Sequence, residues 1–273
     1  MLLNNKKCSN CESYYDPTLN QCPVCHKSNE LYEQRHTPNS IVFLHPISQI
    51  GLFLAGFAYC GMLISQITAT VLFRQIADEG LAKSLILFFA YLMMLGGLLT
   101  IVFTTRRQLF FEKFTRRIDY LFGLAYAGAI FVTGLLVGII VNCFHQGTND
   151  NQKAAIDLIN NYPIFATFVI CLIGPICEEL TYRVGLYSFF RRINIYVAFI
   201  VTTLIFALIH FDFTSKDIIG ELWSLPSYLI CGFLLTLAYE HRGPACSMTA
   251  HIVYNTSAMF AIIIGNWLEK IYG

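Results

Sequence analysis

Six polar side chains in the last third of the chain stand inside stretches that are otherwise typical of membrane-spanning helices. They are two adjacent glutamates, an arginine, two histidines and an asparagine: Glu178, Glu179, Arg183, His210, His251 and Asn255. A charged side chain at the bilayer centre costs about 2.5–3.5 kcal/mol on insertion scales, which makes an accidental set of this size improbable. A carboxylate that activates water, together with donors that stabilise an oxyanion, is equipment for hydrolysis within a membrane.

The spacing of these residues predicts which of them share a helix face. Glu179 and Arg183 are four residues apart, and glutamate before arginine is the favoured order for such a pair. Arg183 can therefore neutralise Glu179, which leaves Glu178, about 100° further around the helix, available for chemistry. His251 and Asn255 are also four residues apart and are predicted to share one face.

A proline precedes the two glutamates by one helical turn. Pro175 has no backbone N–H, so it should free the carbonyl of Cys171 and kink the helix. At about 1.5 Å per residue, Glu178 and His210 lie at similar depths above the basic turn that joins their helices. His251 follows a Gly-Pro break by only a few residues, which predicts that it lies shallower than Glu178 unless the fourth helix extends below the membrane.

Each of these residues also has a purely structural interpretation. The Glu179–Arg183 pair can be a structural ion pair, and His210 can be a hydrogen-bonded core histidine. His251 and Asn255 can serve as polar groups that join helices. The functional hypothesis therefore depends on the whole set of residues.

The composition places the chain among polytopic membrane proteins. Of its 273 residues, 56% are hydrophobic and 13% are charged, and the mean hydropathy is +0.57. Soluble domains are about 45–50% apolar and about 25% charged. A net charge of +1 gives no overall field that would favour nucleic acid. Residues 1–40 contain no apolar run, so the first span is expected to act as an uncleaved signal anchor.

Apolar blocks of the length that a bilayer requires follow one another from residue 50 onward. Polar residues interrupt the last two of these blocks, and an eighth span results if one long block is broken in two. The seven predicted spans are 50–73, 84–105, 119–143, 163–190, 195–213, 222–240 and 246–268.

Basic residues occupy alternate links between these spans. They lie in 106–117, in 191–192 and at Arg242, whereas the other links are acidic or neutral. Lys and Arg favour the cytoplasmic side, so the N-terminus is predicted inside and the C-terminus outside. The segment 106–120 mixes basic and aromatic residues, and it is either a short interfacial helix or a basic loop.

Two CxxC motifs, separated by ten residues, stand in the polar N-terminal region. Each motif can turn two thiolates toward one ion, and two motifs complete a tetrahedral zinc site. A cytoplasmic location argues against disulfides, and a redox dithiol pair or a disordered tail are the alternatives. A site closed by four cysteines should be structural rather than catalytic. The predicted zinc ligands are Cys8, Cys11, Cys22 and Cys25.

The predicted fold is therefore all-α: a polytopic transmembrane helical bundle of about seven spans, with a small N-terminal zinc-ribbon module. Residues 1–40 are predicted to form the zinc ribbon and its linker, and residues 41–273 are predicted to form the transmembrane domain.

The motifs EExxxR, FxxxH and HxxxN follow one another in this order on successive predicted helices. The chain thereby resembles the CPBP family, which comprises CAAX proteases and bacteriocin-processing enzymes and is also called the Abi family. The resemblance covers residues 160–260 and implies a helical intramembrane endopeptidase. It also implies that Glu179 and Arg183 support the site and help to position the substrate.

The same resemblance implies roles for the remaining four residues. Glu178 would be the general base that activates water, and His210 would help to hold that water. His251 and Asn255 would stabilise the oxyanion of the tetrahedral intermediate. Two histidines and a glutamate could also form an open catalytic zinc site. Asparagine is a poor zinc ligand but a good oxyanion donor, which favours the mechanism without a catalytic metal.

Three functions compete at this stage. The first is an intramembrane endopeptidase acting on membrane-associated peptides or proteins, either CAAX-like or leader and signalling peptides. The second is a non-catalytic bacteriocin-immunity protein or membrane scaffold that retains the motifs. The third is a transporter, since transporters also bury charged residues, but the sequence shows no internal repeat. The expected partners are the substrate, the lipid bilayer and a cytoplasmic partner of the zinc ribbon, with no nucleic acid. The expected location is the bacterial cell membrane, with the N-terminus in the cytoplasm.

Overall fold

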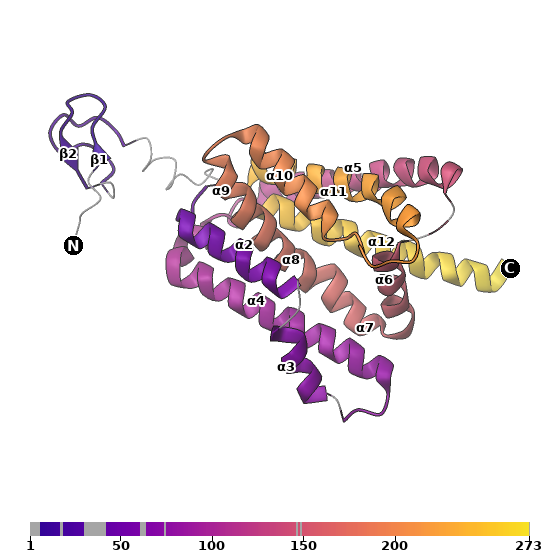
Figure 1. Ribbon diagram of the computed structural model, residues 1–273. Helices are drawn as coiled ribbons and strands as arrows, with labels where there is room; N and C mark the ends of the chain where they lie inside the picture. The colour runs from indigo at the N-terminus through magenta and orange to yellow at the C-terminus, as the bar shows by residue number, and fades with distance from the viewer. Residues whose placement is uncertain are drawn as a thin grey trace.

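The computed structural model describes residues 6–16, 19–29, 42–60, 64–73, 75–145, 147 and 149–272, and Figure 1 shows the arrangement of its elements. A small hairpin of β1 (Lys6–Lys7) and β2 (Tyr14–Tyr15) belongs to the N-terminal module, in which the strands pair antiparallel. Within the described residues from 42 onward the elements are helices, as the all-α prediction requires. They are α2 (Pro46–Cys60), α3 (Ile64–Phe73), α4 (Glu79–Glu112), α5 (Arg117–Phe144), α6 (Asp150–Asn161), α7 (Pro163–Ala166), η1 (Thr167–Ile173), α8 (Gly174–Glu178), η2 (Glu179–Tyr187), α9 (Ser188–Arg191), α10 (Ile195–Leu208), α11 (Ile218–Arg242) and α12 (Pro244–Tyr272).

Five helices of the described chain are long and apolar enough to cross a membrane. They are α4, α5, the continuous rod Pro163–Arg191 that runs from α7 to α9, α11 and α12. Two shorter apolar helices, Pro46–Phe57 and Ile195–Leu208, occupy the places of the first and fifth predicted spans. These helices indicate an integral membrane protein with five candidate spans, where hydropathy alone predicted seven.

The predicted spans and the helices can be compared at three points. The span 50–73 includes residues 61–63, which lie outside the described residues; α2, which ends at Cys60, and α3, which begins at Ile64, are described on either side of them. The span 195–213 is too long, since α10 ends at Leu208, where the chain tightens and His210 N–H donates to the carbonyl three residues earlier. The last apolar block, in contrast, is one helix, α12.

The basic segment after the second predicted span is helical as far as Glu112. A break at Arg106, whose φ and ψ are −149° and 47°, separates this short helical stretch from the rest of α4. Its location at a membrane interface stays a prediction. Lys113 follows and is buried, and its ammonium lies 5.5 Å from the centre of the Phe43 ring. This segment therefore packs on the chain that leads into α2.

The basic links lie together at one end of the bundle. Asp119, at the start of α5, lies 3.9 Å from both Arg116 and Arg242. Arg191, at the end of the rod, pairs with Glu240 of α11 at 2.9 Å. The basic links therefore lie at one end of the bundle, as their alternation with non-basic links in the sequence predicts. The assignment of this end to the cytoplasm stays a prediction.

The rod Pro163–Arg191 positions the candidate site because other helices enclose it. Helix α2 packs along η2, α10 and α12 also contact η2, and α4 contacts η1 and α8 (Figure 1). Every residue of η2 is buried. Two glycines permit the close contact with α2: a Cβ at Gly56 would collide with the Thr181 side chain, and a Cβ at Gly185 would lie 3.0 Å from backbone atoms of Gln49 and Phe53.

This contact gives a test of the packing. We expect Gly185→Ala to lower the unfolding free energy by about 1–3 kcal/mol, because the added methyl group forces two backbones apart. The matched control is Gly96→Ala in α4, where a Cβ meets nothing within 4 Å. That variant should keep or raise the thermal midpoint measured in detergent, since alanine favours helix over glycine. Equal midpoints for the two variants would contradict this packing.

Candidate functional site

Two π-helical segments frame the paired glutamates. The rod is π-helical in η1 and again in η2, with only α8, which ends at Glu178, between them. Segments with this wider turn are rare and often occur at functional sites. Helix turns of this kind change which side chains share a face, so they rotate Glu178 and Glu179 relative to the rest of the rod.

The break at Pro175 lies one residue earlier than the α-helical register predicts. Gly174 N–H donates to the carbonyl of Val169, five residues back, and Pro175 has no N–H to donate to Ile170. The carbonyl of Ile170 instead accepts a hydrogen bond of 2.8 Å from Nδ2 of Asn255. The predicted free carbonyl was that of Cys171; the one that takes the side-chain donor is that of Ile170, because the turn is π-helical.

Four charged or titratable side chains meet directly inside the protein. Glu179 Oε1 accepts from Arg183 Nη1 at 2.9 Å, so the pair expected from the sequence is present. The same oxygen accepts from His251 Nδ1 at 3.0 Å. On the other side of the imidazole, Nε2 lies 3.7 Å from Glu178 Oε2. His251 therefore lies between the two adjacent glutamates.

The two glutamates differ in accessibility. The side chain of Glu179 is 0% exposed and that of Glu178 is 15% exposed. One oxygen of each carboxylate, Glu178 Oε2 and Glu179 Oε2, is buried and has no hydrogen-bond partner among the described residues. A general base must reach water, and the greater exposure of the Glu178 side chain favours Glu178 over Glu179 for that role.

Arg183 is fully buried and is held on three sides. Besides Glu179, its guanidinium donates from Nη2 to the carbonyl of Gly232 at 3.1 Å, and its Cζ lies 4.3 Å from the centre of the Phe206 ring. A buried charge requires this kind of compensation, because desolvation costs more than an exposed pair returns. The planar guanidinium suits both the ring face and the carboxylate.

His210 follows the last turn of α10. The aromatic ring of Phe206 lies between His210 and the charged cluster. Its Nδ1 lies 2.8 Å from the Phe206 carbonyl, which can only accept, so Nδ1 carries a proton and Nε2 of the neutral ring is an acceptor. The Phe206 ring centre lies 5.0 Å from that of His210 and 6.0 Å from that of His251. The ring of Tyr228 stacks on His210 at 4.5 Å.

The predicted difference in depth between His251 and Glu178 is wrong. The break before α12 is not at the protein surface, since residues 243–248 are all buried. Counting residues from this turn therefore does not measure depth in a membrane. The structure thus brings Glu178, Glu179, Arg183 and His251 into direct contact.

Asn255 stands one turn beyond His251 on α12, and its Nδ2 donates to the Ile170 carbonyl. An amide has two N–H groups, so one remains for a further acceptor. Sequence reasoning missed Phe206 as a contact of Arg183 and of both histidines, although it is the first residue of the FxxxH motif.

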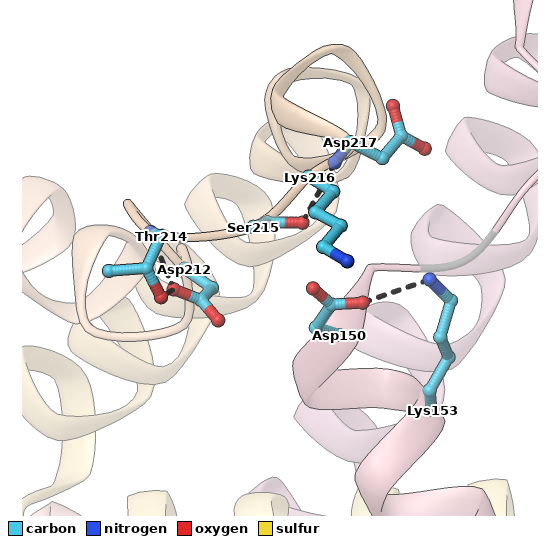
Figure 2. Close-up of a pocket in the computed structure, with 7 residues that line it drawn as sticks. All are labelled: Asp150, Lys153, Asp212, Thr214, Ser215, Lys216 and Asp217. Carbon is cyan, nitrogen blue, oxygen red and sulfur yellow. Dashed lines mark hydrogen bonds and ion pairs between the residues drawn. The ribbon is translucent and has the colours of Figure 1, made fainter.

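A polar crevice of about 400 Å³ lies apart from the six predicted residues. Figure 2 shows its side chains at the start of α6 and in the loop before α11, where Asp150 and Lys153 form an ion pair of 2.9 Å. The hydroxyl of Ser215 and the ammonium of Lys153 hold the pKa of Asp150 below its ordinary value. The crevice is lined by Asp150, Lys153, Asp212, Thr214, Ser215, Lys216 and Asp217.

The four N-terminal cysteines form a second centre with metal-site geometry. All four sulfurs lie within 4.8 Å of one another, and both Cys8–Cys25 and Cys11–Cys22 sulfurs are 3.6 Å apart. A regular tetrahedron with Zn–S bonds of about 2.3 Å has edges of about 3.8 Å. The thiol set therefore fits a zinc ion, and the four cysteines are free of disulfides.

The two halves of this centre repeat one local geometry. Cys8 and Cys22 each accept, at the carbonyl, a hydrogen bond from the residue four positions later, Glu12 or His26. Both of those residues have positive φ, 58° and 54°, which turns the chain back sharply. Backbone N–H groups of Cys11 and Asn10 lower the pKa of Cys8, which favours the thiolate that binds a metal.

Comparison with known proteins finds a family match in the segment that contains the predicted site residues. Residues 160–257 match the family described as Type II CAAX prenyl endopeptidase Rce1-like, a segment that contains all six predicted residues. UPF0177 protein YvdC of Lactococcus lactis subsp. lactis is 28% identical over 137 residues, which are 50% of this chain and 49% of that protein. UPF0177 protein YxdF of the same organism is 30% identical over 131 residues, 46% of this chain and 66% of that protein. The chain thus spans about half of the first relative and 66% of the second, and no solved structure matches.

The buried guanidinium gives one prediction. We expect Arg183→Lys to lower the unfolding free energy by about 3–5 kcal/mol, since an ammonium cannot bond Glu179 and Gly232 while covering the Phe206 ring. The control is Arg107→Lys, whose side chain lies on the exposed side of α4. Accumulation in the membrane and the thermal midpoint report the difference, and a wild-type midpoint for Arg183→Lys would contradict the observed contacts.

The cysteine centre gives a second prediction. Replacing Cys8 and Cys11 together with serine should remove one tightly bound zinc per chain, because two thiolates alone do not hold the ion. Elemental analysis of the purified protein measures the stoichiometry, with the exposed Cys143→Ser as control. Unchanged zinc content in the double variant would show that the metal is held elsewhere.

Proposed function

We propose that this protein is an intramembrane endopeptidase that hydrolyses a peptide bond in membrane-associated peptides or proteins, and the match of residues 160–257 to the Rce1-like CAAX endopeptidase family supports the proposal. One observation carries the proposal: the Glu178 side chain, which is 15% exposed, lies 3.7 Å from an imidazole nitrogen whose ring is oriented by a second, buried carboxylate. A base, a donor and a group that orients the donor are the parts that general base catalysis requires.

In the proposed reaction, Glu178 removes a proton from a water molecule, whose oxygen attacks the carbonyl carbon of the scissile bond. The tetrahedral intermediate carries a negative oxygen, which hydrogen-bond donors stabilise. The C–N bond then breaks, and Glu178 returns its proton to the leaving nitrogen. The products are a carboxylate and an amine, and the enzyme returns to its initial state. General base catalysis of this kind contributes about 10²–10⁴-fold in rate.

The other residues receive roles from their contacts. His251 donates to Glu179 through Nδ1, so its Nε2 faces the side of Glu178 and can donate to the oxyanion when the ring is doubly protonated. Nδ1 of His210 donates to the Phe206 carbonyl, so its Nε2 can accept a hydrogen bond from the water molecule. The second N–H of Asn255 is the other oxyanion donor. Glu179 orients His251 and compensates its positive charge, and Arg183 holds Glu179 in place.

We propose that this chemistry proceeds without a catalytic metal. The donor geometry supports this: among the described residues, the one group of three or more histidine, cysteine or acidic side chains whose ligand atoms converge within 4.8 Å is the four-cysteine set. Nδ1 of His251 also donates to Glu179, so this nitrogen is not free to bind a metal. Zinc would bind Cys8, Cys11, Cys22 and Cys25 and supply structural cross-linking there.

The substrate class follows from the location of the site. A base buried among membrane-spanning helices can act on a segment that reaches the bilayer, such as a prenylated CAAX-like terminus or a leader or signalling peptide. We place the protein in a bacterial cell membrane with the zinc ribbon in the cytoplasm, where the ribbon would bind a substrate or a regulator. The basic residues at one end of the bundle support that orientation.

The test compares peptides from host cells that carry the wild type or Glu178→Gln at equal protein levels. We expect specific fragments to vanish in the variant and their precursors to accumulate, because glutamine cannot take a proton from water. The control is Glu269→Gln, an exposed residue near the end of α12, which should leave the fragments unchanged. Identical peptide profiles for wild type and Glu178→Gln, with a phenotype only in a deletion strain, would instead favour an immunity or scaffold protein.

A further inference from the structure

His210 lies beyond the end of α10, so its position is not fixed by a continuing helix. Its backbone carbonyl is instead held by the side chain of Asn149, whose Nδ2 donates to it at 3.2 Å. Asn149 is 2% exposed and also caps α6, since its Oδ1 accepts from the N–H of Gln152 at 3.0 Å. One buried side chain therefore ties the start of α6 to the backbone of His210.

Tyr228 of α11 adds a second restraint on the same histidine. Its ring stacks on the imidazole with centres 4.5 Å apart and planes at 20°. Its hydroxyl lies 3.3 Å from the side-chain amide of Asn149 and 3.1 Å from Nδ2 of Asn151. The backbone and the ring of His210 are thus both connected to the start of α6.

Glu221 joins these two segments a third time. Its carboxylate is buried at 1% exposure, with Oε1 accepting from the N–H of Asp150 at 2.9 Å and Oε2 accepting from the N–H of Asp212 at 3.1 Å. In the described part of the chain no lysine, arginine or histidine nitrogen is within ion-pair distance of it. Hydrogen bonds from N–H groups to a carboxylate are short and strong, and here they are its compensation for burial.

We infer that Glu221 and Asn149 form a latch that positions His210 for the proposed reaction. The latch joins the N-terminus of α6 to the loop that follows α10, and His210 is two residues before Asp212 in that loop. Neither residue contacts the Glu178–His251 cluster, so both are positioning residues rather than catalytic ones. This inference rests on the proposed function for its effect on cleavage, but the latch itself can be measured without it.

A misplacement of about 1 Å at a reacting group can cost about 10²-fold in rate. Loss of the latch should therefore lower the turnover rate. KM should stay the same, because we expect the substrate to be bound mainly by other surfaces. A role only in stability would lower the amount of folded protein without changing the turnover of the folded fraction.

The experiment uses the full-length protein in lipid nanodiscs. Glu221→Gln keeps the size of the side chain but turns an amide NH₂ toward one of the two N–H groups. Asn149→Ser keeps a capping oxygen for α6 and removes the donor to His210. The matched control is Asp217→Asn, an acid-to-amide change at the exposed N-cap of α11 in the same loop.

Two exchange measurements by mass spectrometry test the latch directly. We expect backbone amides in 209–217 to exchange with deuterium at least about tenfold faster in Glu221→Gln and Asn149→Ser than in the wild type. The C2 proton of the His210 imidazole should also change its exchange rate in both variants. Asp217→Asn should match the wild type in both measurements. Wild-type exchange in Glu221→Gln and Asn149→Ser would overturn the latch.

Cleavage of a precursor that accumulates in Glu178→Gln cells then tests the positioning role. We expect kcat to fall by about 10–100-fold in both latch variants and KM to change by less than about threefold. An unchanged kcat, with faster exchange, would overturn the positioning role. If no Glu178-dependent cleavage exists in the wild type, the proposed function fails, and the exchange data alone decide whether the latch holds His210.

Discussion

One oxygen atom joins the parts of the membrane site. Glu179 Oε1 accepts from both Arg183 and His251, at 2.9 and 3.0 Å, in a region fully closed to solvent. The contact connects the rod to α12, and Arg183 extends it to α11 through the Gly232 carbonyl and to α10 through the Phe206 ring. Removing any member would leave a buried charge uncompensated, so the arrangement of these helices depends on this group of contacts.

The same contacts separate the roles of two adjacent and chemically identical residues. Glu179 Oε1 is bonded to Arg183 and His251 and the Glu179 side chain is 0% exposed, whereas the Glu178 side chain is 15% exposed. Adjacent residues point about 100° apart around a helix, so one carboxylate faces the core and the other faces a less enclosed space. A pair of glutamates in sequence is thereby divided into an orienting group and a candidate base.

Local spacing predicted the parts of this structure that depend on nearby residues. The Glu179–Arg183 pair follows from a separation of four residues, and the convergence of Cys8, Cys11, Cys22 and Cys25 follows from two CxxC motifs. The Asn255–Ile170 bond and the latch at Glu221 join residues far apart in the chain, so no local pattern indicates them. The buried turn before α12 was also missed. Hydropathy averages over this turn, although it decides how close His251 lies to Glu178.

The two ends of the bundle differ in chemistry. At one end, the basic links are paired with Asp119 and Glu240. At the other, Glu221 accepts from the backbone N–H groups of Asp150 and Asp212, two residues that line the polar crevice of Figure 2. The charged cluster at His251 lies on helices that run between these ends, as the proposed intramembrane reaction requires.

The most direct measurement is cleavage of an accumulated precursor by the purified protein in proteoliposomes made up in H₂¹⁸O, with wild type and Glu178→Gln side by side. Hydrolysis by a Glu178-activated water requires one cut whose new carboxyl terminus carries one ¹⁸O atom in the wild type, and no cut in Glu178→Gln. Cleavage by Glu178→Gln at the wild-type rate, or a wild-type product without ¹⁸O, would contradict the assignment of Glu178 as the base that activates water.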